Sequence, residues 1–111
     1  MSTPLPKAVA AYFQLSNAAD STGLKHCFTD TAIVRDEGRE YQGHAAIQAW
    51  MAAARQQYQF TTETGDSEIL LDAIRVHTRV SGNFPGSPVN LDQVFTLSGE
   101  RIASLEIKPC P

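Results

Sequence analysis

Cysteine is scarce in this sequence of 111 residues, and the shortage excludes a disulfide scaffold. Small disulfide-stapled domains carry more cysteines than the two present here, Cys27 and Cys110. No C-x-x-C pair and no other zinc-ligand spacing occurs. We therefore expect Cys27 to be a small buried hydrophobic residue and Cys110 to lie in the tail, where two prolines limit strand extension.

Long apolar runs and an excess of positive charge are also missing. No run approaches the roughly 20 apolar residues that span a bilayer, and the first residues lack the basic-then-apolar pattern of a signal peptide. The net charge of −3 gives no basic excess for nucleic acid. We expect a cytoplasmic protein that binds neither a membrane nor a nucleic acid.

Signature motifs of several enzyme classes are absent as well. The sequence contains no G-x-G-x-x-G, no P-loop, no H-E-x-x-H and no G-x-S-x-G. The three histidines and two cysteines do not cluster along the chain. We therefore expect no metal and no cofactor.

What is present is the composition of one soluble globular domain. Hydrophobic residues make up 42% and charged residues 19% of the chain, and the length suits a single domain over residues 1–111.

The first half of the chain has mainly helical periodicity. It predicts a helix over 5–19, a short second helix with N-cap candidates at Asp20, Ser21 and Thr22, a strand over 32–36 followed by a turn at 37–39, and a helix over 44–57. One face of the first helix would carry Leu5, Val9, Tyr12, Phe13 and Ser16, the short helix Leu24, Cys27 and Phe28, and the last helix Ile47, Trp50, Met51, Ala54 and Tyr58.

The second half has strand periodicity. It predicts strands over 58–64, 68–81, 89–97 and 101–107, with a turn at Gly65–Asp66. In the long strand one face would carry Leu70, Ile74, Val76, Thr78 and Val80, and the other Arg75, His77 and Arg79. We take the apolar face as the inner one; in the opposite assignment the basic trio would line a cavity as an acid-binding site.

Helices grouped early and strands grouped late predict an α+β fold. Helices would cover one face of a mostly antiparallel sheet, and a bent sheet would leave a conical cavity between the two layers.

Four stretches, 9–20, 28–36, 41–50 and 80–91, resemble SnoaL-like domains of the nuclear transport factor 2-like superfamily, which includes ketosteroid isomerases and polyketide cyclases. The resemblance implies three N-terminal helices packed in the concave face of a strongly bent sheet, the cystatin-like cone. It also implies, commonly, a homodimer.

The resemblance places two catalytic candidates. Asp36, at a strand end, matches the isomerases' general base, and an apolar wall would raise its pKa toward the working pH. Tyr12 matches the tyrosine that donates to the substrate oxygen. The alternatives are that Asp36 only stabilises a turn and that Tyr12 is a core residue.

One position departs from the isomerase pattern. Alignment through Phe95 places Gln93 where the isomerases have a protonated acid, while Asp92 would face the other side of the sheet. We expect the pocket to be lined by Gln93 and by soft or aromatic residues that otherwise serve as core: Trp50, Met51, Tyr58, Phe60 and Phe84. The ligand would be small, flat and largely apolar.

Three functions remain open at this point. The first is a cofactor-independent isomerase or cyclase that uses Asp36 and Tyr12. The second is a non-catalytic dimeric binding or accessory module of the same fold. The third is an epoxide hydrolase of the limonene type, which needs an Asp–Arg–Asp set that Arg35 and Asp36 alone do not supply.

The outer face of the sheet is the expected dimer interface. There Arg75, His77 and Arg79 would pair with Asp72, Asp92 or Glu106 of either chain, and the two arginines would favour a neutral His77. His44 and His26 are expected at a helix start and on the surface.

Overall fold

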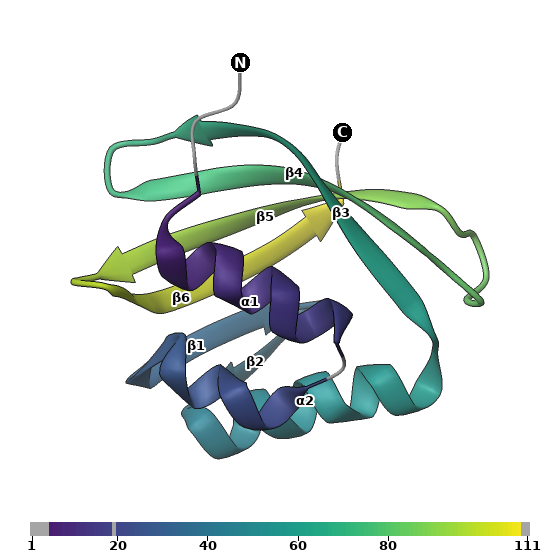
Figure 1. Cartoon of the computed structure of the whole chain (residues 1–111), viewed down its shortest axis with the longest axis horizontal. Coiled ribbons are helices and arrows are strands. Elements are labelled where there is room, and N and C mark those ends of the chain that lie inside the picture. The colour runs from purple at the N-terminus through teal and green to yellow at the C-terminus, as the bar shows by residue number, and fades with distance from the viewer. Residues whose placement is uncertain (1–4, 19, 110–111) are drawn as a thin grey trace.

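The computed structural model describes residues 5–18 and 20–109, so Cys110 lies outside the described part. Figure 1 shows two helices packed on one six-stranded sheet of order β2-β1-β6-β5-β4-β3. The β1–β6 pair is parallel and the other pairs are antiparallel. The elements are α1 (Lys7–Asn17), the 3₁₀ helix η1 (Ser21–His26), β1 (Phe28–Asp36), β2 (Arg39–Gln42), α2 (His44–Gln57), β3 (Phe60–Ile69), β4 (Ala73–Gly82), β5 (Val89–Ser98) and β6 (Arg101–Pro109).

The α+β class is confirmed, but the expectation of three N-terminal helices needs correction. The second helix is one short 3₁₀ segment, and α2 follows β1 and β2 instead of preceding the sheet. Asp20 caps η1, as its Oδ1 accepts from the Thr22 amide at 3.2 Å. The chain turns into β1 already at Phe28, which the sequence had placed in the helix.

The turn after β1 is confirmed, but the strand behind it was not expected. Glu37 and Gly38 have φ of 53° and 76° and connect paired Asp36 and Arg39, the left-handed geometry of a two-residue hairpin. Four mostly exposed residues form β2 at the sheet edge, so no apolar alternation marks it.

The predicted turn at Gly65–Asp66 is wrong. Strand β3 continues through both residues, and the register against β4 shifts between Thr64 and Ser67, which marks a bulge. The reversal comes at residues 70–72, where the Leu70 amide donates to the Ala73 carbonyl oxygen at 2.8 Å. Glycine and aspartate serve both turns and bulges, so the local sequence could not separate the two.

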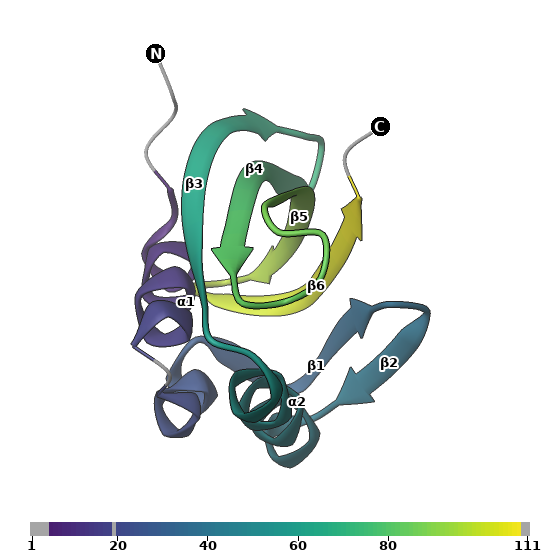
Figure 2. The same cartoon turned by 90° about the vertical axis from the view of Figure 1, so that its right-hand side faces the viewer.

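The sheet bends strongly from β3 to β6 (Figure 2). Helix α1 packs on β3 and β6, and α2 packs on β1 and β2. The inner face of β4 is the apolar one, as predicted, with Ile74, Val76, Thr78 and Val80 all buried. The expected single strand over 68–81 is wrong at its start, because residues 68 and 69 belong to β3 and Leu70 lies in the reversal before β4. The inverted assignment is therefore excluded, and Arg75, His77 and Arg79 lie on the outer face.

Aromatic rings fill one end of the concavity. Tyr12 packs edge-on against Phe13, Phe28 and Phe95, with ring centroids 5.2, 5.8 and 5.6 Å apart. Cys27 is 2% exposed beside them, as predicted. This end of the concavity is solid core.

The end of α1 is attached to the edge strand β3 through Asn17. Its side-chain nitrogen donates to the Thr62 carbonyl oxygen at 3.0 Å, and its oxygen accepts from the Thr62 amide at 2.8 Å. Asn17 thus occupies both backbone groups of one residue on an unpaired strand edge.

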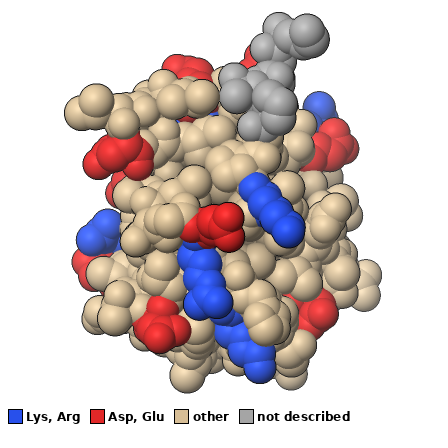
Figure 3. Space-filling model, turned by 60° about the vertical axis from the view of Figure 1, so that its left-hand side comes forward, with Lys and Arg blue, Asp and Glu red and all other residues tan. Residues whose placement is uncertain are grey.

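Charges of both signs are spread over the face drawn in Figure 3. In the described ranges, 5–18 and 20–109, no helix has the length and apolar character needed to cross a membrane.

Candidate functional site

A cavity of about 450 Å³ lies in the other end of the concavity. Its walls come from α1, α2, the turn after β1 and the strands β3 to β6. Every residue that the sequence predicted for the site lines it: Tyr12, Asp36, Trp50, Met51, Tyr58, Phe60, Phe84 and Gln93. The structure therefore brings the predicted set together around one space, while what binds there stays a prediction.

Asp36 ends β1 at the wall of this cavity. The two-residue turn behind it fixes the end of the strand, and the indole Nε1 of Trp50 donates to its Oδ2 at 3.1 Å. Burial raises the pKa of Asp36 above its usual value, against the lowering effect of the Trp50 hydrogen bond, and the charge of Glu37 adds to the rise. The result is a positioned carboxylate that is more basic than a surface aspartate.

Tyr12 reaches the cavity from α1. Burial raises the pKa of its hydroxyl above the ordinary phenol value, and the negative charge of Asp36 raises it further. The phenol therefore stays protonated and is a hydrogen-bond donor. The same shift shows that Tyr12 and Asp36 are electrostatically coupled.

Gln93 lines the cavity from the inner face of β5 and is 4% exposed. Its Nε2 lies 3.4 Å from the Thr78 hydroxyl, whereas its Oε1 is buried and has no hydrogen-bond partner within the described residues. This is the position at which the isomerase pattern calls for an acid.

The charged side chains that line the cavity are acidic. Of the residues described, no Lys, Arg or His lines it, and its only carboxylates are Asp36 and Glu37. Most of the rest of the lining is aromatic or aliphatic. Such walls suit a neutral, largely apolar molecule and disfavour an anion.

Arg55 holds two residues of the cavity wall in place, and the sequence analysis did not identify it. It follows Ala54 on α2, donates through Nη1 to the Phe60 carbonyl oxygen and through Nη2 to Ser16 Oγ at 3.0 Å. Its guanidinium also stacks 3.7 Å from the Phe60 ring centroid. No local signal in the sequence indicates this tertiary contact.

Other lining residues could have been found by strand alternation. Val89 and Leu91 share a face with Gln93 and line the cavity with it. Three further lining residues come from other elements: Glu37 from the turn after β1, Ser16 from the last turn of α1 and Thr62 from the edge strand β3.

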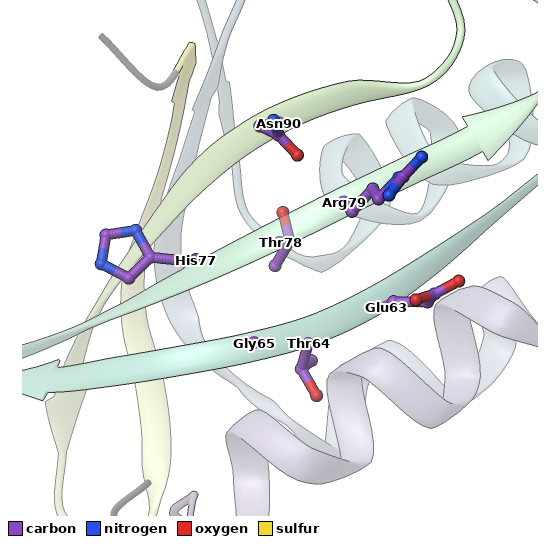
Figure 4. Close-up of a pocket in the computed structure, with 7 residues that line it drawn as sticks. All are labelled: Glu63, Thr64, Gly65, His77, Thr78, Arg79 and Asn90. Carbon is purple, nitrogen blue, oxygen red and sulfur yellow. The ribbon is translucent and has the colours of Figure 1, made fainter.

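Two further hollows lack this character. One, of about 330 Å³, lies over β3, β4 and β5, and Figure 4 shows that its side chains, such as His77, Arg79 and Thr64, point in different directions. The other, of about 900 Å³, runs between α1 and the β5–β6 turn and includes Lys7, Glu100 and Arg101. Neither gathers aromatic walls around a buried polar group.

The outer face corrects the expectation for His77. Its Nδ1 lies 2.5 Å from Asp92 Oδ1 and its Nε2 lies 2.9 Å from Glu68 Oε1. The hydrogen bond to Glu68, and next that to Asp92, raise the pKa of His77, so the carboxylates outweigh the flanking arginines. Arg75 also pairs with Glu68, at 3.6 Å, and the homodimer through this face stays a prediction.

The remaining predicted candidates lie apart from the cavity. His44 begins α2 and its Nε2 bonds the Phe28 carbonyl oxygen at 2.9 Å, and His26 is exposed on η1. Arg35 pairs with Glu40 at 3.5 Å, so it does not join Asp36 in an epoxide-hydrolase set. Across residues 5–18 and 20–109, no three His, Cys, Asp or Glu side chains gather as metal ligands.

Known structures share this architecture over nearly the whole chain. A candidate polyketide cyclase from Sinorhizobium meliloti is 40% identical, with 94% of this chain and 95% of that chain covered and a TM-score of 0.89. A ketosteroid isomerase-like protein from Catenulispora acidiphila, solved with trimethylamine, is 18% identical, with 95% and 86% covered and a TM-score of 0.84.

An epoxide hydrolase/cyclase-like enzyme of pyran ring formation in the polyether salinomycin is 23% identical, with 94% and 88% covered and a TM-score of 0.79. These last two likenesses, at low identity, concern the fold alone. No curated protein sequence matches the chain significantly. Residues 9–105 match the SnoaL-like domain.

Proposed function

The chain belongs to the SnoaL-like domain family, and on this premise we propose that its cavity binds a small, neutral, largely apolar carbonyl compound and moves a proton on it. Asp36 is the general base and Tyr12 the donor to the carbonyl oxygen. The reaction is an isomerisation or a cyclisation and uses no cofactor.

The observation that carries the proposal is the environment of Asp36. Its carboxylate stands at the wall of an apolar cavity, its orientation is fixed by Trp50, and burial raises its pKa. A base whose pKa is moved toward neutrality removes a proton from carbon more effectively. A carboxylate that only stabilised a turn would not need an indole partner on a neighbouring helix.

In the proposed proton transfer, the charge on Asp36 controls how well Tyr12 donates a hydrogen bond. The Asp36 carboxylate takes a proton from the carbon next to the carbonyl, and the electron pair of the C–H bond moves to the oxygen as an enolate. Once Asp36 is neutral, the charge that raised the pKa of Tyr12 is gone. The phenol therefore becomes a better donor as the oxyanion forms.

The enolate then has two outcomes. It takes the proton back at another carbon, which is an isomerisation, or it forms a carbon–carbon bond to a second carbonyl of the same molecule, which is a cyclisation. In the second case Asp36 returns its proton to the new alkoxide. The likeness to a candidate polyketide cyclase at 40% identity supports the cyclisation.

A minimal substrate tests the base directly. The flat bicyclic ketone 2-tetralone has acidic protons beside its carbonyl, and their exchange in D₂O is followed by proton NMR. We expect the protein to accelerate exchange and Asp36→Asn to lose about 10²–10⁴-fold of that acceleration. The matched control is Asp30→Asn, on the same strand but with a side chain that is 88% exposed, and it should exchange like the unaltered protein.

A non-catalytic binding module is the second candidate, and Gln93 favours it. An amide replaces the acid that would support an oxyanion beside Tyr12, which weakens catalysis of the isomerase type. If 2-tetralone binds but exchanges no faster than in buffer, the catalytic proposal is contradicted and the binding module stands.

A further inference from the structure

We propose that Gln93 presents its amide oxygen to the ligand as a hydrogen-bond acceptor, so that the bound molecule carries a neutral hydroxyl or N–H donor at that end. The inference rests on the proposed function in one respect, namely that the cavity binds an apolar molecule. It names the chemical class of that molecule more narrowly.

The first support is an unpaired atom. Gln93 lines the cavity and is almost wholly buried, yet its Oε1 has no hydrogen-bond partner among the residues described. Buried side-chain polar atoms nearly always have one, because an unpaired acceptor loses its hydration without replacement. The oxygen is itself shielded although its residue lines the cavity, so a donor that arrives with the ligand would pair with it after a small rotation of the amide.

The second support is the orientation of the amide. The Thr78 hydroxyl donates its only proton to the Leu91 carbonyl oxygen at 2.8 Å, so towards Gln93 it can only accept. The Gln93 Nε2, at 3.4 Å, supplies that donor. The flipped amide would set two acceptors against each other, and Thr78 therefore keeps the oxygen of Gln93 free.

The third support is that the nearest neighbours of Gln93 on the sheet offer no competing side-chain donor. Across the sheet Gln93 pairs with Val76 on β4 and with Ile107 on β6, and its same-face neighbours along β5 are Leu91 and Phe95. All four side chains are apolar. The last torsion of a glutamine side chain is soft, so the oxygen can turn toward a ligand group without a change in the backbone.

Gln93 therefore offers the ligand a hydrogen-bond acceptor, where a protonated acid would offer a donor. A protonated carboxyl group donates to a developing oxyanion, whereas an amide oxygen repels one and accepts from an alcohol, phenol or enol. A buried ammonium group would lose its hydration among these apolar neighbours, so the donor is neutral. We infer a hydroxylated carbonyl compound, with its carbonyl at Tyr12 and its hydroxyl at Gln93.

A matched ligand pair tests the assignment by isothermal calorimetry. The donor probe is 2-naphthol, and the reference is 2-methoxynaphthalene, which has the same rings and no donor. We expect the unaltered protein to bind 2-naphthol about tenfold more tightly relative to the ether than Gln93→Leu does, the effect of one net hydrogen bond. The control is Asp30→Asn, on β1 and outside the cavity, which should keep the preference of the unaltered protein.

The variant Thr78→Val provides an independent readout with nearly unchanged volume. It removes the group that orients the amide, so the preference for 2-naphthol should fall and the ether should gain affinity. An unchanged ratio of the two affinities in Gln93→Leu would overturn the inference while leaving the cavity proposal intact. Failure of both probes to bind the unaltered protein would overturn the cavity proposal and this inference with it.

Discussion

Both ends of the concavity are built from aromatic residues, but one end is filled and the other encloses a cavity. At one end Tyr12, Phe13, Phe28 and Phe95 pack with centroid separations of 5.2 to 5.8 Å and leave no exposed ring. At the other end Trp50, Tyr58, Phe60 and Phe84 surround about 450 Å³ of space. Tyr12 belongs to both, since its ring is core while it also lines the cavity.

Aromatic content alone therefore does not decide where the fold is hollow. Where α1 lies close to the inner face, the rings meet and close the core. At the hollow end Trp50 on α2, Phe60 on β3 and Phe84 in the β4–β5 connection line the cavity, and Tyr58 and Phe84 contact each other with ring centroids 6.0 Å apart.

The largest expected effect comes from one truncation at each end. Phe95→Ala at the solid end should lower the free energy of unfolding by about 3–5 kcal/mol, because it removes a ring that is 0% exposed. Phe84→Ala at the hollow end should cost less than about 1 kcal/mol, since surface-type substitutions rarely cost more. Urea denaturation measures both.

Binding should reverse that order. Phe84→Ala should weaken binding of 2-naphthol more than Phe95→Ala does, at temperatures where both variants stay folded. Equal losses of stability at both ends would break the distinction between core and cavity.

A smaller effect is expected at the junction of the two ends. Asn17→Ala removes both hydrogen bonds to the Thr62 backbone and should lower stability by about 1–2 kcal/mol. Amide hydrogen exchange should then speed up in β3 near Thr62, a cavity-lining residue, but not in α1 near Phe13. Uniform acceleration along the chain would mean that the ends do not open separately.

The smallest effect belongs to His77, which lies outside both ends. Its pKa is raised by Glu68 and Asp92, so its contribution to stability is full below the ordinary imidazole pKa of about 6.5 and is lost as the pH rises through the raised value. The side chain is 38% exposed, so the change should stay below about 1 kcal/mol.

The variant His77→Gln should remove this pH dependence and leave 2-naphthol binding unaltered. A loss of binding in that variant would connect the outer face to the cavity and contradict their independence.

Much of this arrangement could be predicted from local patterns. Alternation along β4 indicated its buried face, and the Asp36–Glu37–Gly38 sequence indicated the turn that fixes Asp36. The bulge at Gly65 could not be told from a turn, because glycine and aspartate suit both, and β2 carries no apolar pattern.

The contacts that complete the site could not be predicted, because they are tertiary. Arg55 reaches Ser16 and Phe60 from another element. The free oxygen of Gln93 depends on which way the hydroxyl proton of Thr78 points, and that depends on the backbone of the neighbouring strand.

The role of Asp36 as a general base is best tested by titrating its carboxyl carbon by NMR, with and without 2-naphthol. Burial should place the pKa of Asp36 above the ordinary aspartate value, and a ligand that displaces water should raise it further. Asp20, whose pKa is lowered by its Thr22 hydrogen bonds, provides an internal reference that the ligand should leave unchanged. An Asp36 that titrates at the ordinary value and ignores the ligand would contradict the account.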